Sequence, residues 1–193
     1  LRHKGKRSVQ RKEGKAKNKE ALQKELGLEV CPDKPLIGLV SRLTNQKGVY
    51  MITDRIREIM GMDVQFAVLG SGEDNAENAF KWMENEYKGK AVFYCGYNED
   101  LAHRIYASSD IFLMPSLYEP CGIGQLNAMR YGTLPLVRET GGLKDTVQPY
   151  NQYTGEGNGF SFWAANADDM VYTIRWAVEQ YYHNKAGWEG LVN

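Results

Sequence analysis

Residues 111–139 read IFLMPSLYEPCGIGQLNAMRYGTLPLVRE, and the order of segments in this stretch indicates the class of fold. Short apolar runs bounded by Gly, Pro or Ser, which are typical of buried parallel strands, stand at 111–116 and 134–139. A helical stretch at 123–131 lies between them. Because a crossover between parallel strands is almost always right-handed, the stretch predicts one right-handed β-α-β unit.

The same alternation of strand and helix runs through most of the chain. Further strand candidates are PLIGLV, VQFAVLG and AVFYCG, at 35–40, 64–70 and 91–96. Further helical stretches are expected at 46–60, 74–88, 99–109, 142–148 and 167–183. We therefore predict the fold class α/β: a Rossmann-like open parallel sheet with helices on both faces.

The composition is that of one globular domain. The chain has 193 residues, 42% hydrophobic and 25% charged, which is enough for an independent core. No run of about 18 apolar residues is present, so we expect no membrane span. No apolar segment follows the basic N-terminus, which argues against a secretory signal. Three scattered cysteines suit neither a disulfide framework nor a zinc site, and we expect reduced, cytosolic thiols.

Charge is unevenly distributed along the chain. Residues 1–19 contain nine Lys or Arg and one Glu, whereas the whole chain has a net charge of zero. Such an arm could bind nucleic acid or an anionic surface. Because it has almost no apolar or aromatic residues to give specificity, we favour a flexible tail or linker at 1–19 and expect no nucleic-acid partner. The folded domain is then expected at 20–193.

The loops after the five predicted strands are polar or rich in Gly. In chain order they read SRLTNQKG, GSGED, GYNED, SLYEPCGIG and ETGGL. In open parallel sheets, ligands bind outside the carboxyl ends of the strands, where such loops converge. Five loops of this kind on one edge predict a ligand site there.

The first loop contains two cations, Arg42 and Lys47. Thr44 or Asn45 can cap the following helix, which puts Lys47 in the first turn, where its charge opposes the helix dipole. An anion shared by the two cations and the free backbone N–H groups would reverse the sign of that interaction. An exposed lysine that tolerates the small penalty is the alternative, and these residues alone leave both open.

The second and third loops suit an uncharged group. Gly70 and Gly72 lack the third glycine of the dinucleotide fingerprint, and the acidic residues after them would repel a pyrophosphate. Close approach of a nucleobase or ribose fits, and simple turn chemistry fits equally well. Tyr97, which follows Gly96, could stack on a base, with buried packing as its alternative.

The fourth loop places a carboxylate beside glycines. Pro120 holds Glu119 in an extended conformation beyond the strand end, where it can accept hydrogen bonds from sugar hydroxyls. Gly122 and Gly124 leave backbone N–H groups open for phosphate at a helix N-terminus. Hydroxyls beside phosphate indicate a nucleotide-sugar, and a plain turn is the alternative.

The remaining loop features are weaker signals. Gly141 and Gly142 in the fifth loop also precede a short helix. Cys121 has no base near it in sequence, so we do not expect it to act as a nucleophile. The Gly-rich stretch 151–162 could close over the site or be only a long connection. The dispersed histidines have no metal-ligand spacing, and no metal is expected.

Taken together, SRLTNQKG, YEPCGIGQLNAMRYGTLPLVRETGGLKDTV and GNGFSF closely resemble the motifs of the bacterial glycogen synthase and plant starch synthase family, in order and spacing across residues 14–193. Family enzymes have two Rossmann-like domains facing a cleft, the GT-B fold, and this chain looks like the C-terminal, donor-nucleotide half. The resemblance implies a retaining glycosyltransferase of the bacterial cytoplasm or a plastid. It would transfer glucose from ADP-glucose to the non-reducing end of an α-1,4-glucan.

The resemblance also implies roles for matching positions. Arg42 and Lys47 would neutralise the diphosphate as ADP leaves, and Glu119 would hold sugar hydroxyls. Tyr97 would lie against the adenine. Backbone positions complete the predicted nucleotide-sugar site, namely Gly70, Gly72, Gly96, Cys121, Gly122, Ile123, Gly124, Gly141 and Gly142. No cofactor is expected, because the two cations and helix dipoles stabilise the charge.

The chain also departs from the family pattern. Many related retaining transferases have a second Glu eight positions after the first, where Asn127 stands here. The N-terminal domain, which supplies much of the acceptor groove, is expected to be absent. We therefore expect the isolated chain to bind ADP or ADP-glucose and to be inactive. A non-catalytic nucleotide or nucleotide-sugar binding module is the alternative.

Overall fold

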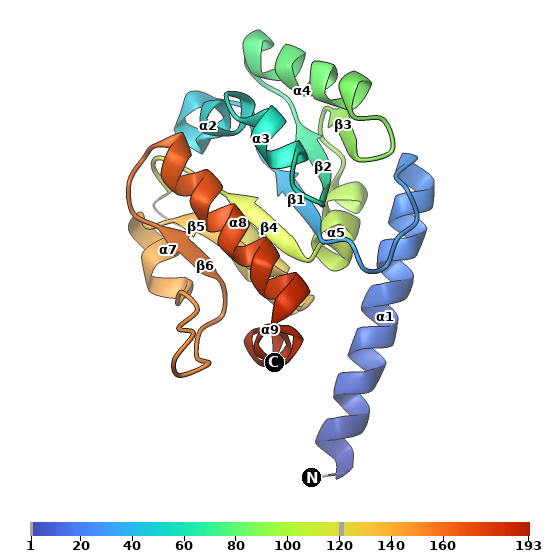
Figure 1. Ribbon diagram of the computed structural model, residues 1–193. Helices are drawn as coiled ribbons and strands as arrows, with labels where there is room; N and C mark the ends of the chain where they lie inside the picture. The colour runs from blue at the N-terminus through green and yellow to red at the C-terminus, as the bar shows by residue number, and fades with distance from the viewer. Residues whose placement is uncertain (1, 120–121) are drawn as a thin grey trace.

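The computed structural model describes residues 2–119 and 122–193, and the side chains from residue 10 onward. In this part of the chain, six parallel strands form one open sheet in the order β3-β2-β1-β4-β5-β6 (Figure 1). Their bounds are β1 (Leu36–Val40), β2 (Gln65–Gly70), β3 (Ala91–Cys95), β4 (Ile111–Met114), β5 (Leu134–Arg138) and β6 (Phe160–Phe162). The first five lie within the ranges that the sequence predicts.

Helices cover both faces of the sheet because successive strand residues point to opposite sides. In β1, Ile37 and Leu39 join one buried cluster and Leu36 joins another. The first cluster packs under α2 (Val49–Thr53), α3 (Ile56–Met60), α4 (Asp74–Glu86), α8 (Ala167–His183) and α9 (Lys185–Val192). The second packs under α1 (Arg2–Leu26), α5 (Glu99–Ser108) and α6 (Gly124–Arg130), and α7 (Gly141–Thr146) packs on β5. The predicted Rossmann-like fold with helices on both faces is confirmed.

Strand β6 and the helix expected at 46–60 differ from the sequence expectation. Strand β6 lies inside 151–162, where the sequence indicates a loop, and it pairs in parallel with β5. Three residues give too short an apolar run to be recognised, and only pairing with β5 defines the strand. The helix expected from residue 46 begins instead as a 3-10 turn, η1 (Asn45–Lys47), which Gly48 separates from α2 with a left-handed φ of 74°.

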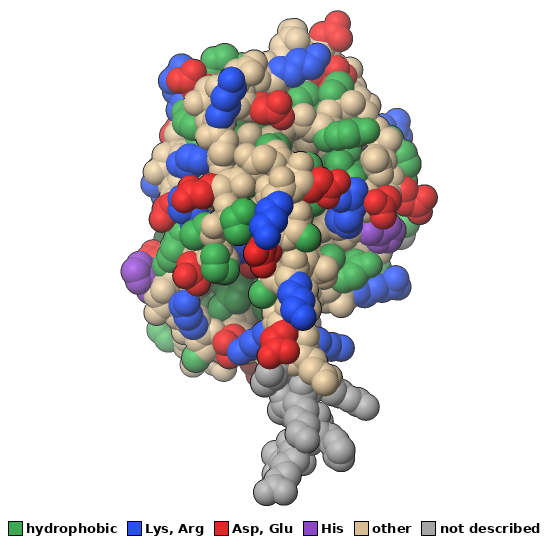
Figure 2. Space-filling model, turned by 90° about the vertical axis from the view of Figure 1, so that its right-hand side faces the viewer, with side chains coloured by type: hydrophobic (Ala, Val, Ile, Leu, Met, Phe, Trp, Pro, Cys, Tyr) green, Lys and Arg blue, Asp and Glu red, His purple; other side chains and the backbone are tan. Residues whose placement is uncertain are grey.

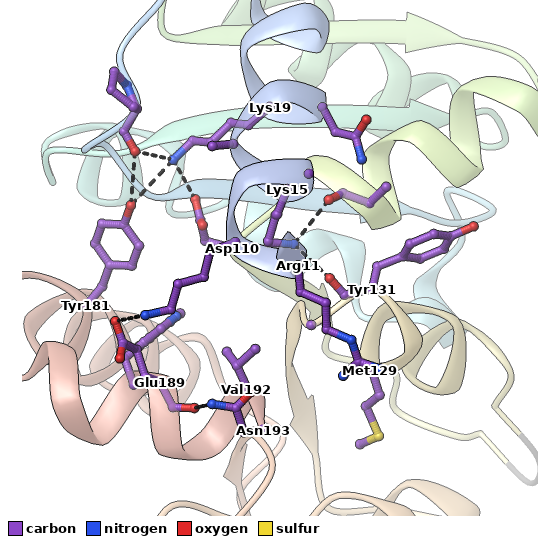
Figure 3. A pocket seen from close by; sticks show the side chains of 18 of the residues that line it. Arg11, Lys15, Lys19, Asp110, Met129, Tyr131, Tyr181, Glu189, Val192 and Asn193 are labelled. Atoms are coloured by element: carbon purple, nitrogen blue, oxygen red, sulfur yellow. Dashed lines mark hydrogen bonds and ion pairs between the residues drawn. The ribbon is translucent and has the colours of Figure 1, made fainter. Parts of the chain in front are cut away.

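Helix α1 runs without a break across residue 19, where the sequence places the boundary between a tail or linker and the folded domain, and the flexibility of that tail stays a prediction. Lys19 is only 4% exposed and anchors the helix to the domain. Its Nζ donates to Asp110 Oδ2 at 2.8 Å and to the Pro32 carbonyl at 3.0 Å (Figure 3). It also donates to the Lys34 carbonyl at 2.5 Å. The same oxygen of Asp110 accepts a hydrogen bond from the amide of Leu36, the first residue of β1.

Lys15 makes a second anchor one turn earlier in α1. Its Nζ donates to Thr133 Oγ1 at 2.7 Å and to the carbonyls of Ala107 and Tyr131 at 3.2 and 3.3 Å. Burial lowers the pKa of Lys15 to about 8. A basic segment therefore packs on the domain, because its lysines find oxygens that satisfy the buried ammonium groups.

The outer surface of α1 is of mixed charge. Figure 2 shows Lys, Arg, Asp and Glu side chains interspersed over the face that α1 crosses. Some pair across elements, as Arg104 of α5 does with Glu25 of α1. Among the helices described, none combines the length and apolar character needed to cross a bilayer.

The strand order reverses beside β1. The chain leaves β1 for helices on the first face, whereas it leaves β4, the neighbour of β1, for α6 on the second face. The loops after these two strands therefore start side by side at the carboxyl edge and lead to opposite faces of the sheet. In open α/β sheets this reversal is where ligands bind.

Lys19→Met should destabilise the domain by about 3–5 kcal/mol, because Asp110 loses its buried cationic partner. Lys24→Met is the matched control, since Lys24 pairs with Glu20 on the exposed surface of the same helix. The control should cost no more than about 1 kcal/mol. Urea unfolding measures both, and equal losses would show that the Lys19–Asp110 pair does not anchor α1.

Candidate functional site

A lysine and a glutamate meet between the loops that follow β1 and β4. Lys47, the last residue of η1, donates from Nζ to Glu119 Oε2 at 2.7 Å. Ser116 Oγ donates to the same oxygen at 3.2 Å. Glu119 is only 8% exposed, and these two donors provide the hydrogen bonds that a buried carboxylate needs. The structure thus brings together two residues that the sequence assigns to one site.

Backbone contacts hold the two loops against each other. The amide of Leu117 donates to the carbonyl of Gln46 at 2.9 Å, which ties the segment before Glu119 to the turn that ends at Lys47. Gly48 lies so close to the end of β4 that a Cβ atom there would sit 2.1 Å from the Pro115 carbonyl oxygen. Glycine at 48 therefore permits both the left-handed backbone and this close approach.

A residue from another loop satisfies the start of η1. Thr44 makes no side-chain cap, and the amide of Asn45 instead donates to Glu73 Oε2 at 2.9 Å. Tyr50 donates its hydroxyl to Glu73 Oε1 at 3.0 Å. Burial, and then the contact with Glu73, raises the pKa of Tyr50. The sequence indicates Glu73 only as a source of repulsion, because its contact with η1 depends on how β1 and β2 pair.

Gly70 and Gly72 pack against the protein's own backbone. A Cβ atom at Gly70 would lie 2.0 Å from the carbonyl oxygen of Ser41. At Gly72 it would lie 2.4 Å from the carbonyl oxygen of Leu43. The amide of Gly72 donates to Glu77 Oε2 at 2.8 Å, which lowers the pKa of that carboxyl. Tight packing between loops accounts for both glycines, and their contact with a ligand stays a prediction.

Arg42 and Tyr97 lie at the same edge of the sheet. Arg42 is exposed, two residues after β1. Tyr97 follows β3 and is 80% exposed, so buried packing does not explain it. Gly96 before it has a φ of 141° and donates its amide to the Gly70 carbonyl at 3.0 Å. The accessible Tyr97 ring is compatible with stacking on a base, which stays a prediction.

The loop after β4 enters α6 at Gly124. Pro120 and Cys121 lie outside the described residues, and so does the contact predicted at Cys121. Ile123 is 65% exposed. A Cβ atom at Gly124 would lie 3.1 Å from the ring of Phe112. Packing against the core accounts for Gly124, and donation from its amide to phosphate stays a prediction.

Gln125, the second residue of α6, links the loop before α6 to the end of α7. Its Nε2 donates to the Gly122 carbonyl at 2.7 Å and to Thr146 Oγ1 at 3.2 Å. A Cβ atom at Gly122 would lie 2.6 Å from Gln125 Oε1, so glycine makes room for this side chain. Gly141 and Gly142 are the first two residues of α7. No local pattern marks a polar residue as buried, which is why Gln125 was not found.

A cavity of about 540 Å³ lies at the opposite edge of the sheet, between α1 and α9 (Figure 3). It is lined by Lys15 and Lys19 and by residues just before the strands, such as Pro32 and Asp110. Both ammonium groups already donate to protein oxygens. Because ligands of such sheets bind at the carboxyl ends, the edge with Lys47 and Glu119 is the candidate site.

Residues 19–187 match the protein family described as Glycosyl transferases group 1. The glycogen synthase of Bacillus cereus is 57% identical over 178 residues, which are 92% of this chain and 37% of the relative. The glycogen synthase of Clostridium perfringens is 54% identical over 185 residues, which are 96% of this chain and 38% of the relative. The chain therefore spans less than half the length of these curated relatives.

Solved structures show the same architecture. The catalytic domain of starch synthase IV from Arabidopsis thaliana, bound to ADP and acarbose, gives a TM-score of 0.86 at 38% identity, over 94% of this chain and 38% of that one. The C-terminal domain of LpcC, a group 1 glycosyl transferase of Francisella tularensis, gives 0.67 at 14% identity, over 91% of this chain and 87% of that one. This second likeness shows the fold alone.

Gly48→Ala should destabilise the domain more than Gly27→Ala does. Both glycines have a left-handed φ, but a Cβ atom at Gly27 would have no neighbour within 4 Å, whereas at Gly48 it would meet the backbone of Pro115. We expect a loss of about 1–2 kcal/mol at Gly27, from backbone strain alone, and a clearly larger loss at Gly48. Urea unfolding compares the two, and equal losses would mean that η1 can retreat from β4 without cost.

Proposed function

The chain belongs to the Glycosyl transferases group 1 family, and within that family we propose that it is the donor-binding part of a glycogen or starch synthase. The reaction proposed for the whole enzyme transfers glucose from ADP-glucose to the non-reducing end of an α-1,4-glucan, with retention of configuration. Similarity to proteins named glycogen synthase, and to a starch synthase structure bound to ADP and acarbose, supports this choice of substrates.

The pairing of Lys47 with buried Glu119 at the reversal of strand order is the observation that carries the proposal. An ammonium group has three N–H donors, so Lys47 can keep one on Glu119 and turn the others to a phosphate oxygen. Arg42 is exposed at the same edge, and its planar guanidinium suits two phosphate oxygens at once. A diphosphate bound beside the loop after β1 would therefore contact two cations, Arg42 and Lys47.

Glu119 is suited to the hexose. Among the described contacts, Lys47 and Ser116 both donate to Oε2, so Oε1 can accept hydrogen bonds from sugar hydroxyls. Bonds from a hydroxyl to a carboxylate are stronger than those between neutral groups, and more so at a buried site. The site would thus tell ADP-glucose from ADP mainly through Glu119.

Charge stabilisation is the chemical contribution proposed for this chain. When the bond between the anomeric carbon and the diphosphate breaks, negative charge grows on the departing ADP. Lys47 and Arg42 would stabilise that charge from fixed positions. Such preorganised cations stabilise a transition state more than water does, because water must reorient around the new charge. In this proposal the two cations take the place of a metal ion, and no cofactor takes part.

The glucan acceptor would be bound with the help of another part of the enzyme. Relatives are more than twice as long as the region they share with this chain. We therefore expect the isolated chain to bind nucleotide without turnover, and the whole enzyme to act in the bacterial cytoplasm or a plastid. Adding the other half of a homologous synthase in trans should restore transfer. Continued inactivity would favour a non-catalytic nucleotide-sugar module.

Substitutions at Lys47 and Glu119 should affect two ligands differently. Lys47→Met should weaken ADP binding by about 1–3 kcal/mol, because a charge-assisted bond is lost. Glu119→Gln should strengthen ADP binding, because Lys47 no longer shares its charge with a carboxylate. It should also lower the affinity for ADP-glucose relative to ADP by about tenfold, because the hydroxyl acceptor is weakened.

Calorimetry with ADP and ADP-glucose measures these changes, and Lys24→Met on the exposed face of α1 is the control that should leave both affinities unchanged. Equal changes for the two ligands in Glu119→Gln would remove the role assigned to Glu119. Failure of the unsubstituted chain to bind either ligand would refute the proposed function.

A further inference from the structure

Arg138 ties the loop before Glu119 to the far half of the sheet. It is the last residue of β5, the neighbour of β4. Its guanidinium donates from Nε to the Ser116 carbonyl at 3.2 Å and from Nη2 to the Leu117 carbonyl. From Nη1 it donates to the carbonyl of Trp163, the residue after β6, at 3.4 Å. One side chain thus joins the ends of three neighbouring strands.

The geometry of these bonds requires a guanidinium. Strand β4 ends at Met114, so the carbonyls of Ser116 and Leu117 lie beyond the ladder that joins β4 to β5. The contacts with the Ser116 and Leu117 carbonyls are partly buried and the contact with the Trp163 carbonyl is exposed, so reaching all three positions takes a donor that spreads over a plane. Arginine presents five N–H groups in a rigid fork, whereas lysine presents its donors from one atom.

The segment 116–119 is therefore held from two sides. On the side of β1, the amide of Leu117 donates to the carbonyl of Gln46, next to Lys47. On the side of β5, Arg138 holds the carbonyls of Ser116 and Leu117. The Ser116 hydroxyl then contacts Glu119 directly. Removing the second anchor would let the segment, and Glu119 with it, move relative to Lys47.

We propose that Arg138 is a positioning residue of the candidate site, which fixes Glu119 at the distance and angle from Lys47 that the ligand requires. Among the described contacts, Arg138 bonds to neither Lys47 nor Glu119, so its effect passes through the 116–119 backbone. The identity of the ligand rests on the proposed function, but the anchoring of the segment does not. A misplacement of about 1 Å at a reacting centre can cost up to about a hundredfold in rate, which makes such an anchor consequential.

Amide hydrogen exchange tests the anchoring without any ligand. Arg138→Lys keeps the charge but cannot reach three carbonyls, and Arg138→Gln is a neutral second variant. Both should raise the exchange rate of the Leu117 amide by about tenfold or more while the midpoint of urea unfolding changes little. Arg104→Lys is the matched control, because Arg104 links α5 to α1 and takes no part in the described contacts of segment 116–119. The control should leave Leu117 unchanged.

A double-mutant cycle tests whether the effect reaches the ligand through Glu119. Arg138→Lys should lower the affinity for ADP-glucose relative to ADP by about tenfold, as measured by calorimetry. In a Glu119→Gln background the same substitution should change that ratio by less than about twofold, because the group being positioned is already altered.

The outcomes separate this proposal from the proposed function. Unchanged exchange at Leu117 in both Arg138 variants would overturn the anchoring, and so would an equal loss of affinity in both Glu119 backgrounds. If the unsubstituted chain does not bind ADP-glucose, the proposed function fails, and the exchange of Leu117 alone then decides whether Arg138 positions the segment.

Discussion

The adjacency of β1 and β4 is the constraint on which the site depends. These strands are separated in sequence by two other strands, and they pair at the point where the order of the sheet reverses. The chain leaves them toward opposite faces, and the two loops contact each other at the carboxyl edge. Lys47 and Glu119 meet only because of this arrangement, and the close approach at Gly48 brings them within hydrogen-bond distance.

Carboxylates already occupy the donors that a phosphate would use. Glu119 accepts from Lys47, and Glu73 accepts from the first amide of η1. Such contacts keep cations and amides in place, because a buried or pre-aligned donor with no acceptor is costly. An anionic ligand must then share or displace these contacts, so its affinity depends on a difference between two sets of charged hydrogen bonds. In the proposed function, Glu119 would therefore favour a sugar while opposing a bare diphosphate.

Charged residues are also used to build the domain itself. Lys15 and Lys19 carry the positive charge that suggests a solvated tail, yet their ammonium groups are surrounded by carbonyl, hydroxyl and carboxylate oxygens. Arg138 shows the same principle at the opposite edge, where its guanidinium satisfies carbonyls that lie beyond the β4–β5 ladder. In both cases a cation serves to complete hydrogen bonding between segments that are far apart in sequence.

Local sequence patterns are enough to predict the class of fold, five of the six strands described and the loops around the candidate site. These features are local, because an apolar run between turn residues is readable from contiguous positions. Long-range packing alone sets the strand order, the position of α1, the strand β6 and the contacts of Glu73, Gln125 and Arg138. Each of these depends on partners distant in the chain. The identity of a polar residue does not show whether its side chain faces water or bonds to a buried carbonyl. Long-range pairing therefore fixed which loops meet, and so which of the predicted residues form one site.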